Sequence, residues 1–222
     1  MSCISSSMSE RISWLDGWRG AVCWMMIVYH LLFDMLLFGW LSDEIMFSLP
    51  MVIFEKVIAY SFILCAGISA CLTRSNVKRG IITIGAAVLV TIASYIVKAP
   101  IRFGILHFLG AAMLLYAWLG KYISRFESAA APVVYLALFI AAYILTGRVL
   151  VDSRWLFWLG FRYSGFVSYD YFPILPNIFL FLTGAWAGRK LVENKDRLPI
   201  LKKTAPLVLA WCHRGYLTVC TR

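Results

Sequence analysis

The chain has 222 residues, of which 62% are hydrophobic and only 14% carry a charge. A soluble domain carries about 25% charged residues, so this composition excludes an ordinary soluble fold and predicts a protein that crosses a membrane several times. The net charge of +10 is typical of the basic cytoplasmic loops of membrane proteins. No basic stripe with interleaved aromatic residues accompanies it, so we expect no nucleic-acid partner.

Apolar runs separated by charged loops predict the fold class, which is an all-α polytopic transmembrane helical bundle of about six spans. The predicted helices cover residues 18–38, 49–72, 80–97, 103–123, 131–146 and 174–187. Residues 155–159 are aromatic and suit the membrane interface, and residues 205–211 form a weaker apolar stretch. The long aromatic loop over 147–173 is expected to be ordered.

Lys and Arg are enriched in the N-terminal arm, in every second loop after it and in residues 189–203, which follow the sixth predicted helix. This distribution predicts a cytoplasmic N-terminus. We expect a cytoplasmic arm over 1–17, a membrane domain over 18–203 and an atypical tail over 204–222. The cysteines form no C-x-x-C pair and the histidines are scattered, so the sequence predicts no disulfide framework and no metal site.

The first predicted helix carries His30 and Asp34, which are spaced i,i+4 and therefore share one helix face. Ionisable groups inside a membrane are costly, so these two are expected to face a protein interior or a wet cavity. A carboxylate beside an imidazole suits a general base. The alternative is a structural histidine bonded to a neighbouring helix.

Asp16 and Arg19 stand at the cytoplasmic mouth of the same helix. Arg19 could clamp a phosphate group, because guanidinium offers a planar fork of donors. The ordinary alternative makes Asp16 a helix N-cap and Arg19 a positive-inside anchor. His107, inside the fourth predicted helix, is either a second acid/base or a structural histidine.

Three stretches resemble a known family. Arg19, ten residues and His30 resemble the R-x10-H signature of membrane acyltransferases that modify cell-surface glycans. The stretches FGILHFLG (103–110) and DYFPILPN (170–177) resemble the bacterial branch of the heparan-alpha-glucosaminide N-acetyltransferase catalytic-domain family. The resemblance covers about residues 11–203.

The resemblance implies a bacterial inner-membrane enzyme that takes an acetyl group from cytoplasmic acetyl-CoA and delivers it to a sugar or glycan-like acceptor outside. On this interpretation Asp16 and Arg19 bind the donor, and His30 is the catalytic base, oriented by Asp34. His107 and Asp170 match motif stretches near the site. Arg102 or His107 would stabilise the developing oxyanion, and Arg102 and Asp170 would contact the acceptor.

The sequence departs from the family in two places. The lysosomal member of the family is expected to have an asparagine at the His30 position and its histidine further along, in the outer loop. This sequence has Phe38-Gly39-Trp40-Leu41 there and no second histidine, which favours His30 as the base in a direct transfer over an acetyl-histidine intermediate. After Trp211 the chain is too short for another span, so our hypothesis is a truncated or frameshifted product. Two other functions stay open. One is a proton-coupled transporter with His30, Asp34 and Glu55 as its relay, and the other is a non-catalytic membrane scaffold. The oligomeric state is also open, with a homo-oligomer as one alternative.

Overall fold

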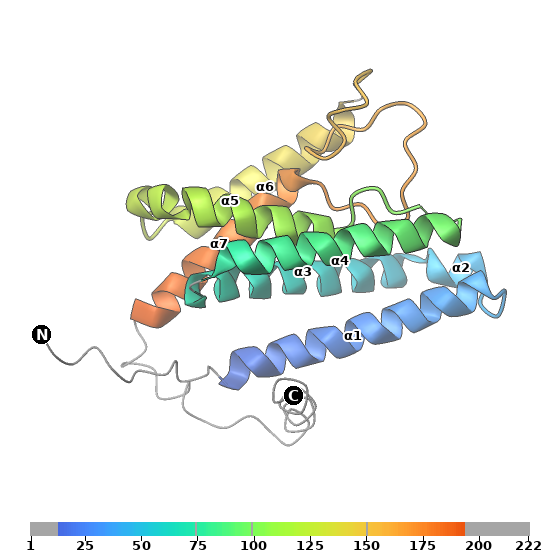
Figure 1. Ribbon diagram of the computed structural model, residues 1–222, viewed down its shortest axis with the longest axis horizontal. Coiled ribbons are helices and arrows are strands. Elements are labelled where there is room, and N and C mark those ends of the chain that lie inside the picture. The colour runs from blue at the N-terminus through green and yellow to red at the C-terminus, as the bar shows by residue number, and fades with distance from the viewer. Residues whose placement is uncertain (1–12, 74, 99, 150, 194–222) are drawn as a thin grey trace, which may run out of the picture. The chain divides into compact units, whose positions relative to one another are not determined.

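The computed structural model describes residues 13–73, 75–98, 100–149 and 151–193. Over these residues the chain is all α, as predicted, and Figure 1 labels seven helices. They are α1 Ser13–Leu37, α2 Asp43–Met46, α3 Leu49–Leu72, α4 Asn76–Ile96, α5 Ile105–Phe126, α6 Ala131–Arg148 and α7 Ile174–Glu193. Within these residues, α1, α3, α4, α5 and α6 are long and apolar enough to cross a membrane, so the chain is a multi-pass integral membrane protein.

Most helix bounds lie within a few residues of the predicted ones, and α3 has the predicted bounds. α1 begins at Ser13, so Asp16 lies in its first turn rather than at an N-cap position. A carboxylate in the first turn still stabilises the helix, because the positive end of the helix dipole lies there. The four-residue α2 was not predicted, since one turn of helix leaves no periodic pattern.

The sixth predicted helix is present as α7, which continues to Glu193. It is not among the helices apolar enough to span alone, because it contains Asn177 and ends in basic residues. Leu175 has non-helical backbone angles (φ −88°, ψ 133°), as expected for a residue that precedes a proline. Residues 205–211 and the predicted tail lie outside the described residues.

The described residues divide into two compact units. The first unit comprises residues 13–62 with Glu193, and the second comprises the described residues between 63 and 192. In the first unit, α1, α2 and the beginning of α3 carry the predicted Asp16, Arg19, His30 and Asp34. Tyr29 of α1 contacts Phe54 of α3, with ring centroids 6.5 Å apart.

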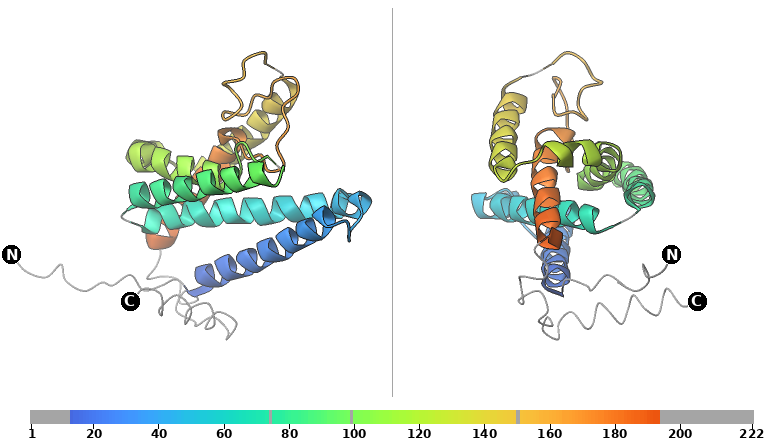
Figure 2. Two further views of the ribbon diagram at one scale, coloured as in Figure 1. Left: turned by 45° about the vertical axis from the view of Figure 1, so that its right-hand side comes forward. Right: turned by 90° about the vertical axis from the view of Figure 1, so that its left-hand side faces the viewer.

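In the second unit, α4 and α5 lie side by side in both figures (Figures 1 and 2). Their close approach depends on glycine, because a Cβ atom at Gly110 would lie 2.5 Å from the Ile84 side chain and 3.1 Å from Gly80 O. In the right-hand view of Figure 2, α7 (orange) lies between α6 (yellow) and α5 (green).

α7 also crosses the end of α3 at a glycine contact. A Cβ atom at Gly67 would lie 2.2 Å from Phe181 O, and one at Gly184 would lie 2.4 Å from Leu64 O. Gly188, one turn after Gly184, meets Ile68 O in the same way at 2.7 Å. Small residues four apart let helix backbones approach closely, which is how helices associate in membranes.

Candidate functional site

One end of the second unit, which we call the loop end, joins the end of α4, the start of α5 and the loop between α6 and α7. Two stretches of the family resemblance meet there, because Phe103 and Tyr171 form a parallel β-bridge. Phe172 N donates to Phe103 O at 2.9 Å, and Tyr169 N donates to Pro100 O at 3.2 Å. Residues far apart in sequence thus form a single surface over the first turn of α5.

Asp170 caps α5. Its Oδ2 accepts a hydrogen bond from Ile105 N at 3.0 Å, at a helix start that has no capping side chain of its own. A Cβ atom at position 104 would lie 2.2 Å from this carboxylate oxygen, so Gly104 is needed for the contact. The predicted acceptor-binding residue therefore fixes the helix that carries His107.

His107 lies in the first turn of α5 and is partly buried against α4. Its Nε2 is 3.3 Å from Thr91 Oγ1, and that hydroxyl donates to Ile101 O at 3.2 Å. Because the Thr91 hydroxyl donates its hydrogen to Ile101 O, its oxygen can accept a hydrogen bond from His107 Nε2. In this tautomer His107 Nδ1 keeps a lone pair.

Arg102 is held by aromatic side chains of the loop. Its guanidinium donates to Tyr163 OH, and its Cζ lies 5.6 Å from the centre of the Phe166 ring, within reach of a cation–π interaction. Its backbone N donates to Ser168 Oγ at 3.1 Å, and Ser168 Oγ donates to Asp170 O at 2.6 Å. Arg102 Nε is buried without a partner among the described residues, so one N–H stays available.

Tyr171 anchors the same loop. Its hydroxyl donates to Phe157 O at 2.6 Å, and its ring contacts Phe166 edge-on with centroids 4.8 Å apart. Burial raises the pKa of Tyr171 to about 12, with Arg162 nearby opposing part of the rise. The hydroxyl therefore stays protonated at any physiological pH and keeps its hydrogen bond.

In the first unit, His30 is an exposed side chain on α1 whose Nδ1 lies 2.8 Å from Met26 O. A carbonyl can only accept, so Nδ1 carries the hydrogen and Nε2 keeps its lone pair. The hydrogen bond to Met26 O therefore sets the tautomer and orientation of the His30 ring, a role that we had expected Asp34 to play. In the described part of the chain, no hydrogen bond joins Asp34 to His30.

The pair predicted to bind the donor lies at the other end of α1. Arg19 Nη1 donates to Asp16 Oδ1 at 2.9 Å in an i,i+3 ion pair, and both side chains are about two-fifths exposed. A mainly apolar cavity of about 500 Å³ has Gly17, Trp18 and Val57 in its walls, and neither Asp16 nor Arg19 lines it. Glu55, which a transporter relay would use, is paired with Lys56 at 2.9 Å.

The structure thus groups Arg102, His107 and Asp170 at the loop end of the second unit, and it places Asp16, Arg19, His30 and Asp34 along α1 of the first. Within residues 13–73, 75–98, 100–149 and 151–193, no three His, Cys, Asp or Glu side chains are grouped so that they could hold a metal ion.

The opposite end of the second unit, which we call the basic end, holds a polar network that the sequence did not predict. Arg189 Nη2 forms an ion pair with Glu127 Oε2, and Tyr135 OH donates to Glu127 Oε1 at 2.7 Å. Arg189 Nη1 donates to Tyr116 OH at 2.5 Å, and Cys71 Sγ lies 3.0 Å from that hydroxyl. The network joins α3, α5, α6 and α7, and its one sequence signal is an arginine that follows the small-residue motif of Gly184 and Gly188.

These features define a class, which is a multi-pass helical membrane protein with histidines inside its membrane-spanning helices. An aromatic loop caps α5, the helix that carries one of these histidines. The chain belongs to the heparan-alpha-glucosaminide N-acetyltransferase catalytic family, whose family model matches residues 11–218. This confirms the predicted family and implies a membrane acetyltransferase. The match continues into residues 204–218, beyond the expected range. No curated protein and no solved structure matches the chain.

Proposed function

We propose that this chain moves an acetyl group from acetyl-CoA on the cytoplasmic side to a sugar or glycan-like acceptor on the outer side of a bacterial inner membrane. One observation carries the proposal, namely the family match over residues 11–218. That range contains all seven candidate residues, from Asp16 to Asp170. The donor enters at the Asp16–Arg19 end of α1, where Arg19 attracts the phosphates of CoA.

The transfer is direct in this proposal. The acceptor nitrogen or hydroxyl attacks the thioester carbonyl while His30 Nε2 takes its proton, the carbon–sulfur bond breaks, and the proton passes to the departing thiolate. The hydrogen bond from Nδ1 to Met26 O supports this role, because it leaves Nε2 as the basic nitrogen. Asp34, one turn further on, stabilises the imidazolium that forms.

The loop end carries the other three candidate residues. Arg102 keeps an unpaired Nε–H, which suits a developing oxyanion or an acceptor hydroxyl. His107 presents its free Nδ1 as an acceptor for a sugar hydroxyl or amine, and Asp170 orients the turn that carries it.

Two variants test the proposal in the purified full chain. We expect His30→Ala to lower acetyl transfer to glucosamine at least about 100-fold, the usual loss for a general base. The same variant should keep the thermal stabilisation by acetyl-CoA, since ligands that bind the folded state raise its melting temperature. Arg19→Ala should lose that stabilisation.

Val28→Ala, an exposed apolar change on the same helix, is the matched control and should alter neither readout. Transfer that persists in His30→Ala would refute the base assignment. If acetyl-CoA does not stabilise a well-folded wild-type chain, the proposal that acetyl-CoA is the donor would be refuted.

A further inference from the structure

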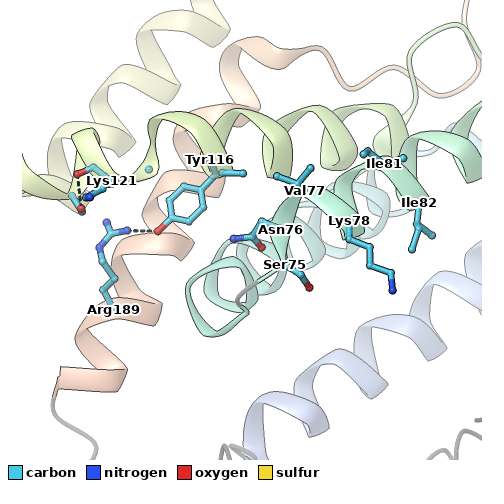
Figure 3. Close-up of a pocket in the computed structure, with 12 residues that line it drawn as sticks. Ser75, Asn76, Val77, Lys78, Ile81, Ile82, Tyr116, Lys121 and Arg189 are labelled. Atoms are coloured by element: carbon cyan, nitrogen blue, oxygen red, sulfur yellow. Dashed lines mark hydrogen bonds between the residues drawn. The ribbon is translucent and has the colours of Figure 1, made fainter. Parts of the chain in front are cut away.

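A cavity of about 790 Å³ opens at the basic end of the second unit, between the start of α4, the last turns of α5 and the end of α7. Figure 3 shows its walls: Asn76, Lys78, Ile81 and Ile82 come from α4, Lys121 from α5 and Arg189 from α7. Neither the acyl-transfer residues of α1 nor those of the loop end line it, so the proposed function leaves this cavity unused.

The cavity is electropositive. Arg189 is neutralised by Glu127, but Lys78 and Lys121 are exposed and form no ion pair with any described residue. Among the residues that the structure describes, no acidic side chain lines the cavity. Two uncompensated ammonium groups therefore remain, which favours an anionic ligand.

Much of the remaining wall is apolar, and it continues onto an exposed face of α4. Ile81 and Ile82 are 59% and 60% exposed, one turn along α4 from Lys78. Because α4 is long and apolar enough to span the membrane, we expect this face to lie against lipid chains. A basic rim above a lipid-facing apolar wall matches a phospholipid, whose phosphate lies above its own chains.

Asn76 adds a second requirement. Its Nδ2 donates to Ala70 O at 2.7 Å, but its Oδ1 is buried without a partner among the described residues. A buried acceptor left unpaired is costly, so a ligand that brings a hydrogen-bond donor is favoured. A headgroup with hydroxyls would provide both the phosphate for the lysines and the donor for Asn76.

We propose that this cavity binds an anionic phospholipid with a hydroxyl-bearing headgroup, of the phosphatidylglycerol kind. Lys78 and Lys121 contact the phosphate, Asn76 accepts from the headgroup hydroxyl, and the acyl chains follow Ile81 and Ile82. Basic pockets between helices at a membrane surface bind anionic headgroups in this way. A soluble nucleotide would instead set its ribose and base against side chains that face the bilayer.

The test uses the full chain in neutral detergent and compares its melting temperature with phosphatidylglycerol and with phosphatidylcholine of the same acyl chains. We expect only the anionic lipid to stabilise the chain. Lys78→Gln with Lys121→Gln should weaken its apparent affinity by about 25-fold, roughly fivefold for each lysine. The two corresponding Lys→Arg substitutions keep the charges and should keep the effect.

Lys98→Gln with Arg148→Gln removes the same charge from exposed positions at the loop end and should leave the effect intact. Equal stabilisation by both lipids, or full stabilisation of the Lys78/Lys121 glutamine variant, would overturn the proposal. It would also fall if adenosine 3′,5′-bisphosphate or inorganic phosphate stabilised the wild type as well as the lipid and lost this effect in the same variant, since the ligand would then be soluble.

Discussion

Asp170 caps α5 and is also proposed to contact the acceptor, and two substitutions separate these two roles. Asp170→Ala removes the hydrogen bond to Ile105 N and should lower the free energy of unfolding by about 1 kcal/mol, the usual cost of a lost N-cap. Asp170→Asn should retain most of that stability, because asparagine caps helices as well as aspartate does. Thermal unfolding measures the first effect, and acetyl transfer measures the second.

The asparagine variant decides what the carboxylate does. If it folds like the wild type and loses transfer, the negative charge takes part in binding or chemistry. If it is fully active, Asp170 serves as a cap alone, and its proposed contact with the acceptor is wrong.

At the residue scale, the sequence indicated which side chains to consider but not their partners. The FGILHFLG and DYFPILPN stretches identified His107 and Asp170 through the family resemblance. Their connection through the first turn of α5 joins segments about 65 positions apart, and such pairing leaves no local pattern. Likewise, the i,i+4 spacing suggested Asp34 as the partner of His30, whereas Met26 O, also four residues away, holds Nδ1.

At the element scale, the glycine contact between α3 and α7 is open to a matched test. Gly184→Ala places a Cβ atom 2.4 Å from Leu64 O, a backbone atom that cannot move aside. We therefore expect the free energy of unfolding to fall by about 1–3 kcal/mol. Gly85→Ala is the control, since a Cβ atom there meets nothing within 4 Å. In a helix interior that change should be neutral or stabilising by up to about 1 kcal/mol.

Melting temperatures of the two variants in one detergent provide the comparison. A Gly184→Ala variant as stable as Gly85→Ala would mean that the two helices do not cross at this glycine.

Long apolar runs were enough to predict the helices that cross the membrane, because the bilayer sets their length. The same rule stopped the last helix at residue 187, where the apolar run ends, although α7 continues to Glu193. Arg189 was counted among the basic residues that follow the last predicted helix, and Glu127 was given no role. Their ion pair depends on how the helices pack, which hydropathy does not encode.

At the scale of the whole molecule, the network at the basic end links four helices through one ion pair. Glu127 is only 6% exposed on its side chain, so Glu127→Gln leaves Arg189 partly buried without its counter-charge. We expect the free energy of unfolding to fall by about 3–5 kcal/mol, the usual effect of removing one partner of a buried ion pair. Replacing both residues, with Glu127→Gln and Arg189→Gln together, should recover part of this loss.

Unfolding of the detergent-solubilised chain measures both variants, with Glu44→Gln as an exposed control of the same chemistry. An unchanged melting temperature in Glu127→Gln would show that the ion pair contributes nothing to the stability of the chain.

The composition of α7 has a consequence for how the chain is made. Polar residues lower the apolarity of α7, and its buried face includes Asn177, Gly184 and Gly188. During synthesis such a segment partitions weakly into lipid by itself, whereas α3 partitions readily. α7 is therefore expected to enter the bilayer late, using the glycine face of an α3 already in place as its docking surface. The order of insertion in this chain then follows helix partnership as well as position in the sequence.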